Sequence, residues 1–467
     1  MEIEFIGAAQ TVTGSMHLVR TSAGAILLDC GLFQGTRSES IERNQNLRVP
    51  IREVKAVVLS HAHIDHSGAL PLLFKLGYTG PVYSTPATRS LAAVMLRDAA
   101  AIQEQDARFL NKRNRKEDNG AEEVKALYTD DDVVRAIERC ISVPYATTVP
   151  IAKNAELTFL DAGHVLGSAI TILDLEDQGQ KRRVVFTGDL GRKDRPILRD
   201  PEVAEGADIL ITESTYGDRL HDNRDKMDDD LAAVVNRTVK RGGKVIIPSF
   251  ALERAQEIVF TLKKLRRANA IPRVPVFVDS PLTVRITDVF KLHPECYDTE
   301  TRALMRGNDS PFDFDDLTYI EDRDVSKRLS ASHDAAIIIS ASGMCEAGRI
   351  LHHLRDGIQD EKNTVLIVGY QAAHTLGRRL VEKRARVKIF GVERERRADV
   401  VVLNGFSAHA DQKDLLAYVA ATREKGPVDK VVLVHGDPGP QKILSEKLGA
   451  AGMKSVTAPA PGDRMPI

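Results

Sequence analysis

Short apolar runs that end in turn-forming or polar residues are the feature of this sequence that most limits its fold. Six lie within the first 208 residues: IEFIG, AILLDCG, AVVLSHAH, PVYST, ELTFLDAGH and RVVFTGD. Runs of this length and β-branched composition predict strands. Side chains that follow strands gather at an edge of the sheet, where loops converge on a common cleft. The sequence therefore predicts an α/β fold with functional groups at its strand ends.

The character of the runs changes between residues 209 and 399. The strands expected there, GKVIIPSF, VPVFVDS, AAIIISAS and NTVLIVGY, are almost continuously apolar, and each precedes helix-compatible sequence. This βαβ alternation is typical of a parallel sheet covered by helices on both faces. Strands that end in polar residues, like those of the first 208 residues, are expected again in VVLNGFSAHAD and KVVLVHGD. We therefore predict a first domain over residues 1–208, an inserted domain over 209–399, and a segment over 400–467 that completes the first domain's sheet.

Composition excludes several classes of protein. The 467 residues are 43% hydrophobic and 28% charged with a net charge of −1, which is typical of a folded soluble chain. The four cysteines form no C-x-x-C pair, so we expect reduced thiols rather than a cysteine zinc site or disulfides. The acidic N-terminal sequence and the lack of a long apolar run predict a cytoplasmic protein with no membrane segment.

Three basic stretches leave two interpretations open. NKRNRKEDNG, at residues 111–120, interrupts a helical region over 87–140 and predicts a solvated linker, with a nucleic-acid contact as the alternative. KKLRR, at 263–267, and EKRARVK, at 382–388, are interpreted as solvated helix faces, with a wider electrostatic footprint as the alternative.

Residues 61–68, HAHIDHSG, hold three histidines and an aspartate directly after the apolar run VKAVVLS. His61 and His63 lie two apart, so in extended backbone they point to the same side. Asp65 and His66 follow in the turn before the helix-like SGALPLLFKLG. Imidazole and carboxylate ligands suit Zn²⁺, and their density here indicates two divalent metals rather than one.

Four further polar residues at strand ends would complete two coordination spheres. They are Asp29 in LLDCG, His164 in DAGHVLGS, Asp189 in FTGDLG and His435 in LVHGD. Each motif alone is a weak signal, because a Gly-Asp pair after a strand is more often a turn. Together, in this order, they indicate one metal centre.

These motifs carry a family resemblance. LLDCG, HAHIDH, GHVLGSA and TGDLG resemble the four ordered motifs of the metallo-β-lactamase superfamily, and TESTYGDR, GFSAHAD and VLVHGD resemble three further motifs of its β-CASP branch. That branch includes bacterial and archaeal ribonucleases and the nuclease subunit of the eukaryotic pre-mRNA cleavage and polyadenylation factor. The resemblance implies an αββα sandwich with an inserted parallel-sheet α/β domain.

The resemblance also implies how the ligands divide between two zinc ions. One zinc would be held by His61, His63 and His164, and the other by Asp65, His66 and His435. Asp189 would bridge the two ions. Asp29 would orient a ligand histidine and so fix its tautomer. Manganese in place of zinc stays open.

Two metals would activate a water as hydroxide and clamp a phosphodiester, and in-line attack would leave a 5′-phosphate and a 3′-hydroxyl, as the resemblance also implies. His409, in FSAHAD, is required by neither metal set, so we interpret it as a general acid or phosphate clamp. Glu213, in ITESTYGD, is its expected orienting partner. The predicted catalytic residues are Asp29, Asp65, Asp189, Glu213 and His409.

The inserted domain offers a path for RNA. Backbone amides and serine hydroxyls at helix N-termini bind phosphates without reading bases, whereas 5% aromatic residues and no tryptophan disfavour a base-stacking platform. His374, in GYQAAHTLGR, is either a substrate contact or an inert histidine. The expected RNA contacts, each with a helix cap or a turn as its alternative role, are Ser249, Arg254, Ser280, Ser342, Gly343 and Arg349, with His409 beside them.

The predicted function is a zinc-dependent ribonuclease acting on single-stranded RNA, with endonuclease, 5′-to-3′ exonuclease and homodimer formation left open. A DNA nuclease is one alternative, although the resemblance disfavours it because DNA-processing members lack a histidine matching His435. A hydrolase of small thioesters or lactams is a second, but it has no need of the inserted domain. A catalytically dead RNA-binding scaffold is a third, and it would have lost metal ligands.

Overall fold

The computed structural model describes residues 1–35, 37–117, 123–221, 226–372 and 374–467, which form two compact units. Unit 1 comprises Met1–Leu220 and His409–Ile467, and unit 2 comprises His221–Ala408. Both boundaries lie later in the sequence than the predicted ones. The predicted boundaries cut through two strands, β11 (Ala207–Glu213), which pairs within unit 1, and β19 (Asp399–Val402), which pairs within unit 2.

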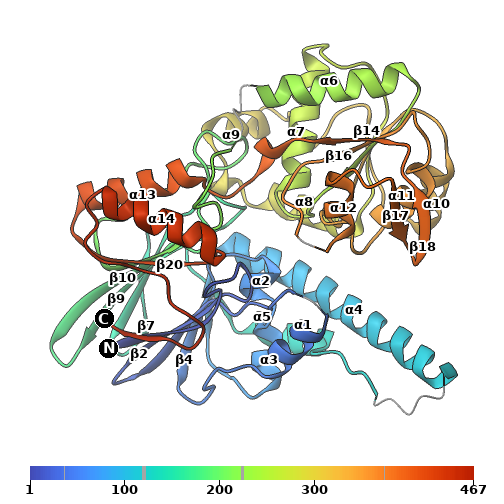
Figure 1. The fold of residues 1–467 in the computed structure, drawn as a ribbon. Coiled ribbons are helices and arrows are strands. Elements are labelled where there is room, and N and C mark those ends of the chain that lie inside the picture. The colour runs from blue at the N-terminus through green and yellow to red at the C-terminus, as the bar shows by residue number, and fades with distance from the viewer. Residues whose placement is uncertain (36, 118–122, 222–225, 373) are drawn as a thin grey trace. The chain divides into compact units, whose positions relative to one another are not determined.

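Unit 1 contains two seven-stranded sheets with an apolar core between them (Figure 1). The strand order of the first sheet is β22 (Arg464–Pro466), β1 (Glu2–Gly7), β2 (Met16–Thr21), β3 (Gly24–Leu28), β4 (Val54–Val58), β5 (Val82–Ser84) and β6 (Cys140–Ser142). The strand order of the second is β21 (Val456–Thr457), β20 (Val428–Val434), β11, β10 (Gln180–Phe186), β9 (Ala169–Asp177), β8 (Ala155–Asp161) and β7 (Thr148–Ala152).

Alternation along the strands builds the core between the sheets. In β8, every second side chain is buried, because successive residues of a strand point to opposite faces. Leu157 and Phe159 thereby join Ile3 and Phe5 of β1 in one buried cluster. The αββα sandwich that the resemblance implied is therefore confirmed.

The C-terminal segment completes the sheets of unit 1, as predicted. β20 pairs in parallel with β11 and places Val432 opposite Ile211. β22 pairs antiparallel with β1 at the edge of the other sheet. Strands from both ends of the sequence therefore hold unit 1 together.

Helices cover the outer faces of these sheets. Leu415 and Val419 of one helix and Leu444 of another pack in a cluster over the second sheet. The helices of unit 1 are α1 (Arg37–Gln45), α2 (Ile64–Ser67), α3 (Leu70–Lys75), α4 (Pro86–Glu117), α5 (Asp130–Glu138), α13 (Gln412–Lys425) and α14 (Pro438–Ala450).

The basic stretch at residues 111–120 is not a linker over most of its length. Helix α4 continues through residue 117, and residues 118–122 lie outside the described part of the chain. The Asn111 side chain donates to the Val124 carbonyl at 2.9 Å and accepts from the Val124 amide at 2.9 Å. These two bonds fasten the returning chain to the helix and stabilise its last turns.

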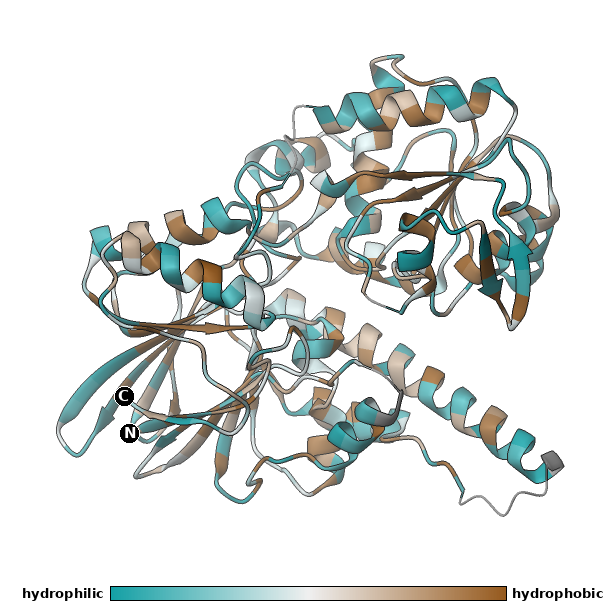
Figure 2. Ribbon diagram, viewed as in Figure 1, coloured by the Kyte–Doolittle hydropathy of each residue, from teal (hydrophilic) through white to brown (hydrophobic). Residues whose placement is uncertain are grey.

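Unit 2 is built on a six-stranded sheet in which every neighbouring pair is parallel, as predicted, and Figure 2 shows its strands in hydrophobic colours. Its strand order is β14 (Leu317–Tyr319), β13 (Val276–Val278), β15 (Ile337–Ser340), β12 (Val245–Pro248), β16 (Thr364–Ile367) and β19. A separate hairpin consists of β17 (Arg386–Ile389) and β18 (Val392–Glu395).

Two apolar clusters of unit 2 pack helices against its sheet. One contains residues of α6 and α7, and the other contains residues of α11 and α12. The helices are α6 (Met227–Lys240), α7 (Arg254–Arg267), α8 (Pro281–Leu292), α9 (Thr299–Arg306), α10 (Arg323–Ala331), α11 (Ile350–Gly357) and α12 (Leu376–Val381), with single 3₁₀ turns at η2 (Pro294–Cys296) and η3 (Asn404–Phe406).

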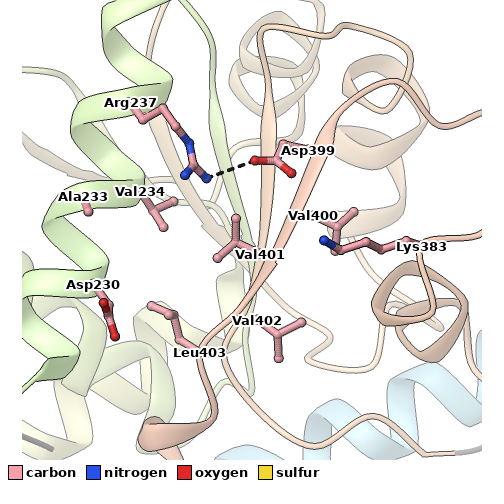
Figure 3. Close-up of a pocket in the computed structure, with 10 residues that line it drawn as sticks. All are labelled: Asp230, Ala233, Val234, Arg237, Lys383, Asp399, Val400, Val401, Val402 and Leu403. Atoms are coloured by element: carbon pink, nitrogen blue, oxygen red, sulfur yellow. Dashed lines mark hydrogen bonds and ion pairs between the residues drawn. The ribbon is translucent and has the colours of Figure 1, made fainter.

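A pocket of about 610 Å³ lies between α6 and β19, the edge strand of the unit 2 sheet (Figure 3). Val234 and Leu403 contribute apolar walls, and the Arg237 guanidinium pairs with the Asp399 carboxylate at 3.0 Å. Among the described residues that line this pocket, none is a histidine or a predicted metal ligand.

Two predictions from composition can be compared with the structure. Cys30, Cys140, Cys296 and Cys345 are buried free thiols, as predicted. Within the described ranges, no helix combines the length and the apolarity needed to cross a membrane.

Truncation of the inter-sheet core should destabilise the chain. Phe159 is wholly buried, so Phe159→Ala should lower the free energy of unfolding by about 3–5 kcal/mol, because it removes buried area and leaves a cavity. Ile141 is 46% exposed on edge strand β6, and Ile141→Ala should change it by about 0.5 kcal/mol or less. Urea unfolding followed by circular dichroism measures both; equal effects would contradict this packing.

Candidate metal centre

The predicted ligands follow strands whose ends meet at one edge of unit 1. The amide of Ala169 in the second sheet donates to the Ser60 carbonyl, just past β4 of the first sheet, at 2.8 Å. The two sheets are therefore joined where their polar residues emerge. These residues are Asp29 after β3, His61 after β4, His164 after β8, Asp189 after β10, Glu213 at the end of β11 and His435 after β20.

The HAHIDH stretch turns back tightly against the end of β3. His61 Nε2 lies 3.1 Å from His63 Nδ1, so these two rings converge, as their spacing predicted. Gly31 permits the close approach of the following turn, since a Cβ at this position would lie 1.7 Å from the Asp65 carbonyl oxygen. The Cys30 amide also donates to the His66 carbonyl at 2.8 Å. The position of Asp65 and His66 is thus set by backbone contacts.

The Asp29 carboxylate organises the ligands from below. It is fully buried and accepts hydrogen bonds from Ser15 Oγ at 3.1 Å, from Ser60 N at 2.8 Å and from Ser60 Oγ at 3.0 Å. His66 Nδ1 lies 2.7 Å from Asp29 Oδ2. An Nδ1–H donated to this carboxylate leaves the lone pair on Nε2 for a metal, which is the orienting role predicted for Asp29.

The loop that carries His164 is held by hydroxyl groups. The backbone amide of His164 donates to Ser168 Oγ at 3.0 Å. Thr85 Oγ1 and Thr88 Oγ1 both donate to the Gly167 carbonyl, at 2.7 and 2.8 Å. Because both threonines are buried, the loop is fixed to the N-terminal turn of α4.

Asp189 lies at the centre of the imidazole rings. Its Oδ2 lies 3.5 Å from His61 Nε2 and 3.6 Å from His164 Nε2, and its Oδ1 lies 3.3 Å from His66 Nε2 and 3.3 Å from His435 Nδ1. Each carboxylate oxygen therefore faces a different group of histidines, which is the geometry of a bridging ligand.

Ligand atoms within 4.8 Å of one another form two main sets. The first is His61, His63, His164 and Asp189, and the second is Asp65, His66 and His435. A further grouping of Asp189, Glu213 and His435 overlaps them. The structure thus brings together all seven predicted ligands, in the division that the resemblance implied.

The contacts within the cluster fit cations. His66 Nε2 lies 3.2 Å from His435 Nε2, and two ring nitrogens at this distance repel unless a proton or a cation lies with them. Among the described residues, the ring nitrogens of His164 and Oδ1 of Asp189 are buried without a hydrogen-bond partner. Unsatisfied buried groups are costly, and coordination to a metal would satisfy them. Imidazole and carboxylate donors in this combination fit zinc.

The electrostatics of the cluster set the protonation states of its ligands. Burial and the neighbouring imidazoles hold the pKa of His61 and of His164 well below the usual value. Burial alone would raise the pKa of Asp189, but His435 and His66 lower it well below its usual range. Burial alone would lower the pKa of His66, but the Asp189 and Asp29 carboxylates raise it well above the usual value, so His66 must release a proton when it binds a metal. Neutral His61 and His164 beside an ionised Asp189 are already in the forms that bind a metal.

His409 and Glu213 form a pair beside Asp189. His409 Nδ1 lies 3.2 Å from each carboxylate oxygen of Glu213 and 3.8 Å from Asp189 Oδ2. Burial would lower the pKa of His409, but the Glu213 and Asp189 carboxylates raise it to about 9. Glu213 is itself buried and accepts from the Leu190 amide at 2.7 Å. The predicted partnership of these two side chains is present.

Backbone contacts set the position of His409. Its neighbour Ala410 donates to the Leu190 carbonyl at 2.7 Å. Asp411 then caps α13, since its carboxylate accepts from the amides of Lys413 and Asp414 at 2.9 and 3.1 Å. The short segment from His409 to the cap residue Asp411 is therefore held by backbone contacts on both sides.

Sequence reasoning missed the hydroxyl groups that support the ligands. Ser15 and Ser60 bind Asp29, and Ser60 Oγ also lies 3.0 Å from His61 Nδ1. Thr215 Oγ1 lies 3.1 Å from His435 Nδ1 and donates to the His435 carbonyl at 3.0 Å. The signal that could have found them is their place one to three residues from a ligand or at a strand end.

The residues of unit 2 predicted to contact RNA make internal contacts. Ser280 caps α8 by accepting from the Thr283 amide at 3.3 Å, and Ser342 Oγ accepts from the Glu346 amide at 3.2 Å. Ser249 Oγ donates to the Phe250 carbonyl at 3.0 Å. These bonds belong to the cap and turn roles, and the RNA contacts stay predictions.

The other predicted RNA contacts are similarly engaged. Arg349 donates to Asp279 Oδ1 at 2.7 Å, and the Gly343 carbonyl accepts from a side-chain amide at 3.0 Å. Arg254 is 8% exposed and lies 3.9 Å from Glu257. His374 is exposed at φ +69°, and its carbonyl accepts from a guanidinium at 2.9 Å. Its role also stays a prediction.

Comparison with known proteins places these features in a family. The chain matches the Metallo-beta-lactamase superfamily over residues 10–234, the Beta-Casp domain over 255–380 and the Zn-dependent metallo-hydrolase RNA specificity domain over 393–459. It is 34% identical over 467 residues to Ribonuclease TTHA0252 of Thermus thermophilus, with 100% of both chains covered.

The chain is also similar to a relative of lower identity and, in fold, to a solved structure. The chain is 30% identical over 448 residues to Transcription termination factor FttA of Methanosarcina mazei, covering 94% of this chain and 67% of that relative. A solved structure of a protein of unknown function from Enterococcus faecalis V583 aligns over 99% of both chains, with a TM-score of 0.51 and 13% identity, which shows a likeness of fold.

The fold and the metal-ligand cluster define a metal-dependent hydrolase. The chain belongs to the β-CASP branch of the metallo-β-lactamase superfamily, which confirms the resemblance carried by its motifs.

Removing the charge that orients His66 should weaken metal binding. In Asp29→Asn, an NH₂ group replaces one of the two carboxylate oxygens, which accept hydrogen bonds from Ser15, Ser60 and His66. We therefore expect a loss of roughly 10–100-fold in zinc affinity. Competition against a chromophoric chelator measures this affinity, and circular dichroism shows whether the fold is kept.

Asp177→Asn is the matched control. Asp177 is also buried and also accepts from a serine, through the Ser22 amide at 3.0 Å and the Ser22 hydroxyl, but it lies outside the ligand sets. Its zinc affinity should equal that of the wild type. If both variants lose affinity equally, Asp29 has no specific role at the metal centre.

Proposed function

We propose that the chain is a zinc-dependent ribonuclease that hydrolyses phosphodiester bonds of single-stranded RNA and leaves a 5′-phosphate and a 3′-hydroxyl. The observation that carries this proposal is the two ligand sets, with Asp189 facing histidines of both and the His409 and Glu213 pair directly beside it. Endonuclease and 5′-to-3′ exonuclease modes are both compatible with it. A cytoplasmic location and a homodimer, predicted from the sequence, belong to the same proposal.

The family supports RNA as the substrate. A relative that matches the whole chain is named a ribonuclease, and the matched RNA specificity domain, residues 393–459, contains both His409 and His435. His435 contacts Asp189 and lies beside Asp65, so it is integral to the ligand cluster. The DNA alternative, which the resemblance disfavoured on account of this histidine, is the weaker candidate.

Two zinc ions fit the donor atoms of the two sets. When bound, they would lower the pKa of a water and place positive charge on the phosphate oxygens. Asp189 would hold both ions in register, because each of its oxygens faces a different set of histidines. Asp29, held by Ser15 and Ser60, would keep His66 oriented toward the ions.

The chain's own residues account for the remaining proton transfer. As the water oxygen bonds to phosphorus, the bond between phosphorus and the 3′-oxygen breaks, and that oxygen takes up a proton. We assign its donation to His409, whose imidazolium the Glu213 carboxylate stabilises and orients through Nδ1. Glu213 is fixed by the Leu190 amide, so the donor is held before the substrate binds.

An assay with end-labelled RNA and DNA of one sequence tests this function. Zinc-loaded protein should cut the RNA, leave 5′-phosphates and lose its activity after chelation, while the DNA stays intact. His409→Ala should lower the cleavage rate by roughly 10²–10⁴-fold, as removal of a general acid does. Glu213→Gln should keep zinc binding and lower the rate by a smaller factor.

His333→Ala is the matched control, since His333 is an exposed histidine of unit 2 outside every predicted site. It should cut RNA at the wild-type rate. If the zinc-loaded protein cuts neither polymer, the ribonuclease proposal fails and small thioesters become the substrates to test. Equal cleavage of both polymers would favour the DNA nuclease alternative.

A further inference from the structure

The C-terminal part of α4 concentrates positive charge. Positions 108–116, RFLNKRNRK, hold five basic residues and no acidic one. We call residues 108–115 the α4 arm. Figure 1 shows α4 as one long helix whose C-terminal part extends beyond the other helices of unit 1.

The basic side chains of the α4 arm face solvent. Lys112, Arg113 and Arg115 are exposed, whereas Leu110, on another side of the helix, is buried. The buried side of the arm is occupied by the returning chain, through Asn111 and its two bonds to Val124. The charged face is therefore a fixed helical surface and not a solvated linker.

All four basic side chains of KKLRR have acidic partners, but in EKRARVK only Arg384 and Arg386 do, and Lys383 and Lys388 have no ion-pair partner among the described residues. The pairs in KKLRR are Lys263–Asp309, Lys264–Asp228, Arg266–Asp316 and Arg267–Asp309, and those in EKRARVK are Arg384–Glu382 and Arg386–Glu393. In the α4 arm, Arg108 pairs with Glu104 at 3.0 Å. Among the described residues, Lys112 and Arg115 have no ion-pair partner. Lys112 and Arg115 are therefore available to bind phosphates.

An aromatic side chain accompanies this charge. Phe109 is 67% exposed, and it lies one residue from Arg108 and four from Arg113. On a helix, residues four apart share a face, so Phe109 and Arg113 are neighbours at the surface. A basic face with an exposed aromatic ring is the combination that binds single-stranded nucleic acid, through phosphates and base stacking.

We propose that the α4 arm binds the backbone of the RNA substrate at a distance from the metal centre. This inference rests on the proposed function and extends it to a second contact surface. Lys112, Arg113 and Arg115 would neutralise phosphates, and Phe109 would stack with a base. The contact is independent of sequence, because it reads charge and ring faces rather than base edges.

The position of the arm sets the length of RNA that it can reach. Thr88, in the first turns of α4, binds the loop of His164 at the metal centre. Lys112 follows Thr88 by 24 helical residues, which is about 36 Å along the axis. At about 3.4 Å per nucleotide, an RNA must extend roughly ten nucleotides from the cleavage site to reach the arm. Shorter substrates should not sense it.

The test compares RNA binding by the full chain before and after the arm is neutralised. The variant is Lys112→Gln/Arg113→Gln/Arg115→Gln, made in the His409→Ala background so that the RNA stays intact. Loss of three phosphate contacts should lower the slope of log affinity against log salt by about 2 for a 30-nucleotide RNA. At low salt the affinity should fall roughly tenfold or more. A hexanucleotide should bind both proteins equally.

Lys153→Gln/Lys447→Gln/Lys454→Gln is the matched control, because it removes the same charge from exposed lysines of unit 1 outside the arm. Its salt slope should equal that of the parent. If the arm variant and the control bind the long RNA equally, the inference is overturned. If the arm variant instead loses self-association in sedimentation while its RNA affinity is unchanged, the face binds protein and the inference is also overturned.

Cleavage by the wild-type protein distinguishes a failure of the arm assignment from a failure of the proposed ribonuclease function. If wild-type protein cleaves RNA and the arm variant binds as the parent does, only the arm assignment is wrong. If wild-type protein cleaves no RNA, the proposed function fails whatever the arm binds. The arm variant with His409 restored should cleave the hexanucleotide at the wild-type rate but cleave the long RNA more slowly at low RNA concentration. This result would support both the proposed function and the arm assignment.

Discussion

The parallel pairing of β20 with β11 is the interaction on which the rest of the metal centre depends. It brings His435 beside ligands that come from the first half of the sequence. The pairing continues past the strands, since Ser214 Oγ donates to the Val434 carbonyl at 2.6 Å and the Ser214 amide donates to the His435 carbonyl at 3.2 Å. Without this register, the second ligand set would lack a member.

The same pairing explains why unit 2 can be inserted without disturbing the site. The chain leaves unit 1 after β11 and returns to it at His409, and β20 follows α13. The residues on either side of the insertion, Glu213 and His409, meet at a distance of 3.2 Å. Both side chains belong to unit 1, so their contact and the metal-ligand cluster are formed within the same unit.

Buried charge gives the centre its chemistry and also its requirement for cations. Asp29, Asp189 and Glu213 are almost fully buried, and six histidines surround them or lie beside them. Asp29 and Glu213 are satisfied by amides and hydroxyls, whereas within the described residues Oδ1 of Asp189 has no hydrogen-bond donor. Polar groups left unpaired in a dry interior cost free energy, so binding of cations would stabilise the folded unit as well as prepare it for hydrolysis.

The apolar composition of the strands predicted the parallel inserted sheet, and the polar residues at strand ends predicted one metal centre. The sandwich and the division of the ligands were implied by the family resemblance that the ordered motifs carry. The sequence misplaced the domain boundaries by cutting through β11 and β19, since a strand's composition does not tell which sheet it joins. It treated residues 111–117 as a linker, because the bonds from Asn111 to Val124 that stabilise the helix are tertiary. Ser15, Ser60 and Thr215 escaped notice because hydroxyl residues at strand ends are common and their partners are set by the fold.

Anomalous diffraction from zinc-loaded crystals, recorded on both sides of the zinc absorption edge, would locate the metal ions relative to the two ligand sets. We expect two peaks roughly 3.5–4 Å apart, one on each side of the Asp189 carboxylate, because two-metal hydrolases hold their ions at this separation. One peak would belong to His61, His63 and His164, and the other to Asp65, His66 and His435. A single peak, or two peaks that do not share Asp189, would show that the two ligand sets do not form one bridged two-metal centre.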